Sequence, residues 1–254
     1  MRIDYYAYRS AMRNVSPEIK LLLALGTLLI TVSADMLALS LFVIATMSII
    51  TVFFARTPLK IYLHYMSVPV MFMLISGFMI AAQVRRTAAG EWNINLSLLF
   101  ICFTRESIVQ SVEVFCKAFA GVSALYMMSF STPMSEIMTV LQKLHLPRLF
   151  VELMALIYRY IFILYDVAER MQTAAGSRLG YRGFMQSLRT FAAIAGNLFF
   201  ISLKKADAYY DALIARGYDG RLEFLSEDRP VSAVWASVTA LYFVVLCMVI
   251  FLNF

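Results

Sequence analysis

Five apolar runs limit what this 254-residue chain can fold into. A helix of about 20 predominantly apolar residues spans the hydrocarbon core of a bilayer. The chain is 61% hydrophobic and 15% charged, whereas soluble domains are roughly 45–50% apolar. We therefore predict an all-α, polytopic membrane protein with about five transmembrane helices, at residues 20–32, 37–55, 65–82, 108–130 and 231–251.

Basic residues orient these helices, because Lys and Arg are enriched in cytoplasmic loops. The stretch before the last apolar run holds more than half of the 22 Lys and Arg residues. This distribution places the N-terminus, the loop at 56–64 and the stretch 133–230 in the cytoplasm. Three arginines would then lie outside, against the rule, and a sixth, hidden span is the alternative; they are Arg85, Arg86 and Arg105.

The spans divide the chain into three parts. Residues 1–131 form an N-terminal membrane domain of four spans, 132–230 a cytoplasmic helical region, and 231–254 a C-terminal transmembrane helix. Between the third and fourth spans, residues 94–98 alternate between apolar and polar side chains, which predicts an extended segment.

The cytoplasmic region is predicted to consist of long, mostly amphipathic helices. The first follows Pro133 and ends before Pro147, and a long second helix begins near residue 148. An apolar helix over 184–203 returns toward the bilayer. Because it carries polar side chains, we expect it to lie buried in protein or half-submerged, followed by a last amphipathic helix from Leu203.

An internal repeat runs through this region with an offset of 38 residues (216 minus 178). Ser177 and Arg178 in the first copy correspond to Ala215 and Arg216 in the second. The matches continue upstream, where Ala168, Glu169 and Ala174 correspond to Ala206, Asp207 and Ala212.

A Gly-Tyr pair follows each arginine of the repeat, namely Gly180-Tyr181 and Gly217-Tyr218. The repeat predicts two helices that end alike and present one arginine each. A helix-capping arginine is one interpretation, since a cation is favourable at a helix C-terminus. The shared upstream positions favour a second one, in which another protein binds both arginines. A guanidinium can hold a carboxylate with two hydrogen bonds, which lysine cannot copy.

Several chemical functions find no support in the sequence. The two histidines, His64 and His145, and three cysteines, Cys102, Cys116 and Cys247, are far apart, so no metal site of this chain alone is expected. There is no phosphate loop of the form G-x-x-x-x-G-K-[ST], so we expect no ATP binding. The spans offer no nucleophile–base set or HExxH motif for an integral-membrane enzyme. We attribute the net charge of +6 to cytoplasmic residues near anionic lipid, not to nucleic-acid binding.

Short motifs along nearly the whole chain resemble one family. Ala215-Arg216-Gly217 resembles the second of two Ala-Arg-Gly-like motifs, and the segment 175–180 resembles the first, with Leu179 where Gly or Ser is usual. Leu146-Pro147-Arg148, the segment 158–161 and residues 4–20 resemble further family segments. The family is the transmembrane (T) component of energy-coupling factor (ECF) transporters, EcfT/CbiQ, and the likeness is strongest to its cobalt-type branch.

The resemblance implies a non-catalytic subunit of an ATP-driven importer in a bacterial or archaeal cell membrane, with its N-terminus in the cytoplasm. Two cytoplasmic ABC ATPase subunits, which carry ATP and Mg²⁺, would each receive one coupling helix. Co²⁺ would bind to a separate membrane substrate-binding (S) subunit, and this chain would bind no cofactor. The residues expected to couple to the ATPases are Ser177, Arg178, Gly180, Ala215, Arg216 and Gly217.

Three alternatives stay open at this point. The first is a T subunit for nickel or a vitamin. The second is a stand-alone secondary carrier, for which Glu113 and Lys117 are the intramembrane candidates. The third is a metal-conducting track of methionines such as Met71–Met73 and Met127-Met128, which ordinary packing also explains.

Overall fold

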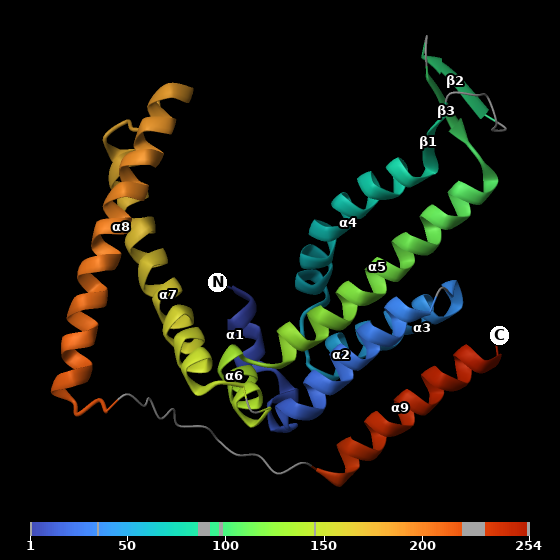
Figure 1. The fold of residues 1–254 in the computed structure, drawn as a ribbon, viewed down its shortest axis with the longest axis horizontal. Coiled ribbons are helices and arrows are strands. Elements are labelled where there is room, and N and C mark those ends of the chain that lie inside the picture. The colour runs from blue at the N-terminus through green and yellow to red at the C-terminus, as the bar shows by residue number, and fades with distance from the viewer. Residues whose placement is uncertain are drawn as a thin grey trace. The chain divides into compact units, whose positions relative to one another are not determined.

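The computed structural model describes residues 2–34, 36–85, 92–96, 99–144, 146–219 and 232–252. They form two compact units, Met1–Val140 with Asp228–Phe254 (unit 1) and Leu141–Glu227 (unit 2). Figure 1 shows their elements, which are α1 (Arg2–Arg9), η1 (a 3₁₀ helix, Ala11–Asn14), α2 (Pro17–Ser33), α3 (Leu37–Ile49), η2 (a π-helix, Ile50–Phe54), α4 (Leu59–Ala81), β1 (Ala82–Arg85), β2 (Trp92–Leu96), β3 (Leu99–Phe103), α5 (Arg105–Ser131), α6 (Met134–Lys143), α7 (Arg148–Ser177), α8 (Phe184–Ala215) and α9 (Ala233–Leu252).

Helix α5 is the centre of unit 1, because α2, α3 and α4 all pack against it. Small side chains allow these helices to approach closely. Several polar side chains inside the bundle bond back to their own helix, as Thr27 does to the carbonyl of Leu23, and others bond to a neighbouring helix, as Ser111 does to the carbonyl of Gly77. This leaves the core apolar, with buried residues Ala24, Leu39, Val43, Met47, Ala120, Ala124, Met127 and Leu246.

The predicted class of helical, polytopic membrane protein is confirmed. Within the described residues, five helices are long and apolar enough to cross a membrane, Leu37–Phe54, Leu59–Ala81, Arg105–Ser131, Phe184–Ala215 and Ala233–Phe251. Four of them match predicted spans. The remaining predicted span corresponds to α2, whose 17 residues lie at the lower end of the spanning range.

The fifth helix of sufficient length and apolarity is α8, which corrects a prediction. The apolar helix over 184–203 and the amphipathic helix from Leu203 are one continuous helix of 32 residues. The sequence changes there from apolar to charged, at Lys204 and Lys205, but residues 197–215 contain no Gly or Pro. A change of polarity without a breaking residue does not end a helix, so the predicted boundary was wrong.

The connection between α4 and α5 contains a small antiparallel sheet in the order β1-β3-β2. Its register pairs Ala82 with Phe103 and Trp92 with Phe103 on either side of the central strand. The predicted extended segment is confirmed for 94–96, while 97–98 and Arg86 lie outside the described residues. The described part of this connection is therefore β-structure, and a hidden sixth span does not lie within it.

A close approach between α2 and α9 yields a test of the packing. A Cβ added at Gly26 would lie 2.6 Å from Cζ of Phe243. We expect Gly26→Leu to lower stability by about 1–3 kcal/mol through overpacking. Adding Phe243→Ala should restore part of this loss, because it removes the obstructing ring. Thermal unfolding of the detergent-purified variants measures both effects, and equal losses with and without Phe243→Ala would contradict the packing.

Candidate functional site

Unit 2 is built around an antiparallel hairpin of the 30-residue α7 and the 32-residue α8 (Figure 1). The Tyr160 hydroxyl donates to the carbonyl of Lys205 at 3.2 Å, and Arg159 donates to the Tyr209 hydroxyl at 3.2 Å. Arg159 also lies over the Tyr209 ring, and the rings of Tyr160 and Tyr209 meet edge to face. Burial raises the pKa of the Tyr160 phenol. These contacts fix the alignment of the two helices.

Helix α7 ends in a Schellman motif with Arg178 at the C-cap. The N–H of Leu179 donates to the carbonyl of Gly176 at 3.1 Å, and the N–H of Gly180 donates to that of Ala175 at 2.8 Å. Leu179 has a φ of +57°, which is left-handed and unusual for a leucine.

Helix α8 ends in the same way, with Arg216 at the C-cap. The N–H of Gly217 donates to the carbonyl of Ile214 at 2.9 Å, and the N–H of Tyr218 donates to that of Leu213 at 3.0 Å. Gly217 adopts a φ of +81°, which a glycine reaches without steric cost. The prediction that two helices end alike, each with one arginine, is confirmed in its geometry.

The structure corrects the alignment of the residues after the arginines. The left-handed position is Leu179 in the first copy and Gly217 in the second, so Gly180 corresponds to Tyr218. Gly180 is a glycine for another reason, because the chain turns back there onto α8. The Thr190 hydroxyl donates to its carbonyl at 2.7 Å, and a Cβ would lie 2.9 Å from the carbonyl oxygen of Ala175.

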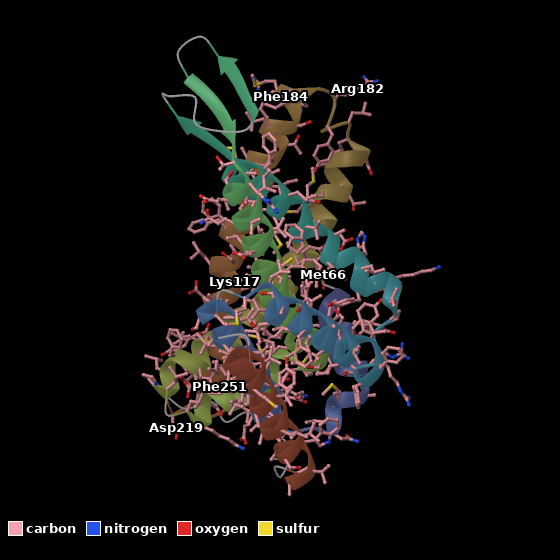
Figure 2. All side chains as sticks on the ribbon, turned by 90° about the vertical axis from the view of Figure 1, so that its right-hand side faces the viewer. Met66, Lys117, Arg182, Phe184, Asp219 and Phe251 are labelled. Atoms are coloured by element: carbon pink, nitrogen blue, oxygen red, sulfur yellow. The ribbon has the colours of Figure 1, made fainter. Side chains whose placement is uncertain are left out.

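The six predicted coupling residues form two groups at opposite ends of the hairpin. Ser177, Arg178 and Gly180 lie at the end marked by Arg182 and Phe184 in Figure 2, whereas Ala215, Arg216 and Gly217 lie near Asp219. At about 1.5 Å of rise per residue, the length of α8 separates the two groups by about 48 Å. The hydroxyl of Ser177 bonds to the carbonyl of Thr173 within its own helix.

Both arginines are exposed, and no group in the described part of the chain forms a hydrogen bond or ion pair with either guanidinium. Their location at helix C-termini is electrostatically favourable. A shallow polar depression lies beside Arg178 on α7, lined by Asp166, Glu169, Arg170, Thr173, Ala174 and Ser177.

No group of three or more His, Cys, Asp or Glu side chains that could hold a metal ion occurs among the described residues. Cys116 and Cys247 are free thiols on separate helices.

Comparison with known proteins identifies the family. A model of the cobalt transport protein family CbiQ matches residues 9–225, which include both arginine-tipped helix ends. The chain belongs to the CbiQ cobalt transport protein family. The predicted resemblance to EcfT/CbiQ is thereby confirmed, and this CbiQ-family chain is a multi-pass membrane component of a cobalt transport system.

Relatives of this CbiQ-family chain span bacteria and archaea. Cobalt transport protein CbiQ of Salmonella typhimurium is 27% identical over 86% of this chain and 97% of its own length. An uncharacterized protein of Methanocaldococcus jannaschii is 30% identical over 99% of this chain and 93% of its own. The putative fused cobalt transport protein CbiMQ of Methanocorpusculum labreanum is 29% identical over 94% of this chain. The matched region makes up 40% of the length of that protein.

The two helix ends differ at the left-handed position, and the effect of this difference can be measured. A left-handed conformation costs a non-glycine residue about 1–2 kcal/mol. We therefore expect Leu179→Gly to tighten the end of α7 and Gly217→Leu to loosen the end of α8. Hydrogen exchange of the amides of Leu179, Gly180, Gly217 and Tyr218 should slow in the first variant and accelerate in the second. Faster exchange after Leu179→Gly would contradict the cap geometry.

Proposed function

We propose that this chain is the T subunit of an ECF-type, ATP-driven importer. In this proposal the ends of α7 and α8 each dock onto one of two cytoplasmic ABC ATPase subunits. The membrane helices pass the resulting movement to a separate S subunit, and this chain carries out no catalysis itself.

The proposal depends on one observation, which is that neither arginine is needed to cap its helix. In each Schellman motif, backbone N–H groups already occupy two of the four carbonyls that a helix end leaves without partners, and no guanidinium bonds to the others among the described residues. Capping therefore does not require the guanidinium of Arg178 or Arg216. Two exposed guanidiniums in the same backbone setting suit a pair of related partners, each offering carboxylates to one fork.

The relatives support the proposed substrate and the need for a second membrane subunit. Two of them are named as cobalt transport proteins, and a third is named as a fused cobalt transport protein of which this chain covers 40%. We assign Co²⁺ to the S subunit, and ATP with Mg²⁺ to the ATPases. Uptake of Ni²⁺ or a vitamin in place of Co²⁺ by the purified complex would change the cargo but not the role.

The proposal requires unit 2 to lie in the cytoplasm with the N-terminus, in accord with the basic residues. We expect Ser177→Cys, in a chain whose native cysteines are replaced, to react with a membrane-impermeant thiol reagent in inside-out vesicles only. Ser33→Cys, at the far end of α2 and exposed, should react in right-side-out vesicles only. The reverse pattern would overturn the orientation.

Removing both guanidiniums tests the docking. Loss of one partner of a buried ion pair costs about 3–5 kcal/mol, so Arg178→Ala with Arg216→Ala should abolish Co²⁺ uptake and release the ATPases during purification. Each single change should have a smaller effect. Uptake in vesicles and co-purification of the ATPases measure both results.

Two controls accompany the double variant. Arg189→Ala removes an exposed arginine near the start of α8, away from both helix C-termini, and should leave uptake and assembly intact. Arg178→Lys with Arg216→Lys keeps the charge but not the two-pronged geometry, and we expect it to behave closer to the alanine variant. Normal uptake by the alanine double variant, or uptake by this chain alone in ATP-free vesicles, would contradict the proposal.

A further inference from the structure

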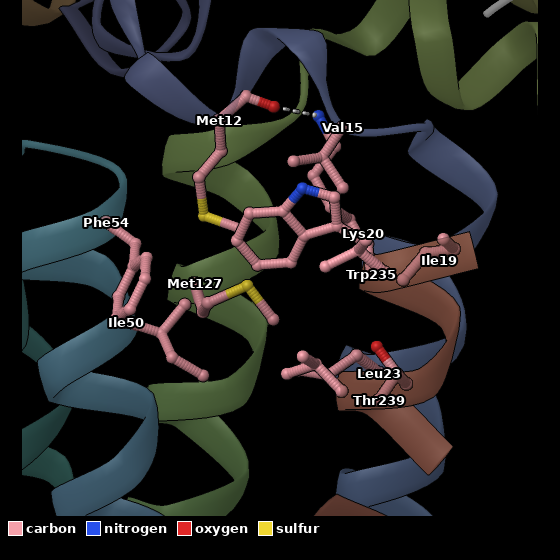
Figure 3. Close-up of a pocket in the computed structure, with 12 residues that line it drawn as sticks. Met12, Val15, Ile19, Lys20, Leu23, Ile50, Phe54, Met127, Trp235 and Thr239 are labelled. Atoms are coloured by element: carbon pink, nitrogen blue, oxygen red, sulfur yellow. Dashed lines mark hydrogen bonds between the residues drawn. The ribbon is translucent and has the colours of Figure 1, made fainter. Parts of the chain in front are cut away.

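A buried cation ties four elements of unit 1 together. Lys20, near the start of α2, is only 2% exposed. Its Nζ donates to the carbonyl of Met12 in η1 at 3.3 Å and to that of Ser131, the last residue of α5, at 3.0 Å. It also forms an ion pair with Oε2 of Glu136 in α6 at 3.4 Å. Figure 3 shows the Lys20 stem in an apolar pocket together with Met12 and Trp235.

The electrostatic setting of Lys20 is favourable on both sides. The carbonyl of Ser131 belongs to a helix C-terminus, which attracts a cation, and Glu136 lies in the first turn of α6, where an anion is favoured. Among the described residues, three acceptors thus lie within hydrogen-bond distance of the ammonium, which has three N–H groups. The ion pair fixes the corner between α5 and α6, where Thr132 and Pro133 are also buried.

Stability alone gives a weak reason for charges at this place. Apolar residues of similar size often replace a buried ion pair with no loss of stability. What a directed ion pair adds is a defined orientation of α6 against α2 and α5. This orientation matters because the boundary between the units falls inside α6, after Val140. A helix moves as a rigid rod, so a displacement at its distal end reaches Glu136.

We propose that the Lys20–Glu136 ion pair is the joint through which movement of unit 2 reaches α2 and α5. Both are positioning residues that couple ATP hydrolysis to transport. This inference rests on the proposed function and assigns a specific task to two residues of the membrane unit. It predicts that loss of the pair separates hydrolysis from uptake without separating the subunits.

The decisive variant replaces both charges, Lys20→Met with Glu136→Leu, because it leaves no unpaired buried charge. The complex of this chain with its ATPases and S subunit is reconstituted in vesicles, and ⁵⁷Co²⁺ uptake and ATP hydrolysis are measured on the same sample. We expect normal assembly and thermal stability, continued hydrolysis, and at least about a fivefold fall in Co²⁺ taken up per ATP, the lower end of typical coupling between sites. Lys60→Met, at an exposed lysine near the start of α4, is the matched control and should keep the wild-type ratio.

The outcomes separate this inference from the proposed function. A wild-type ratio in the double apolar variant would overturn the joint and leave the proposed function standing. Failure of the wild-type chain to retain its ATPases would instead reject the proposed function. If the double variant is unstable, Lys20→Arg and Glu136→Asp provide a second measurement, because each keeps both charges. Each of them should take up more Co²⁺ per ATP hydrolysed than Lys20→Met alone. Equal ratios in these variants would again overturn the joint.

Discussion

The rest of the structure depends on one constraint, which is that lipid offers no hydrogen bonds to a peptide backbone. Inside the bundle this makes helices the only solution, and it directs polar side chains back to their own helix. Thr27, Thr31 and Thr51 each donate to a carbonyl four residues earlier. Other polar side chains bond to a neighbouring helix, as Ser111 does to the carbonyl of Gly77 and Thr46 to the Tyr242 hydroxyl. The backbone groups that lack a partner within their own helix lie at its two ends.

The chain satisfies its helix ends in two different ways, and the difference separates structural from exposed cations. At the end of α5 the carbonyl of Ser131 receives the ammonium of Lys20, which is buried and committed to the fold. At the ends of α7 and α8 backbone N–H groups take the carbonyls, and the cations at those ends stay exposed. An arginine that is held at a helix end but whose guanidinium makes no hydrogen bond there is suited to binding another protein. The C-terminus of a helix can therefore stabilise the fold, where a buried side chain donates to its carbonyls, or present an exposed cation, where backbone N–H groups donate to them.

Local signals in the sequence predict the helices and the place of both arginines, whereas distant contacts escape them. Pro147 and the repeat mark the beginning of α7 and the ends of α7 and α8, since caps and breakers act within a few residues. The continuity of α8 was missed because polarity was taken for a boundary. The left-handed conformation of Leu179 was missed because leucine rarely adopts a positive φ. Lys20 could not be paired with Ser131 or Glu136, which lie 111 and 116 residues away, because only tertiary packing brings them together.

The geometry of the hairpin also limits how the two arginine ends can move. Arg178 lies at one end of α8 and Arg216 at the other, so the rise of 32 helical residues holds them about 48 Å apart. A helix cannot shorten by several ångströms without breaking its hydrogen bonds. In the proposed function, movement of the two docked partners toward each other must therefore turn the hairpin. No residue of α8 is buried among the described residues, and α8 bonds to α7 near Tyr160 and Tyr209. A further bond, from the Thr190 hydroxyl to the carbonyl of Gly180, holds the turn between the two helices. The hairpin is thus held at two places along its length, which favours its movement as one body.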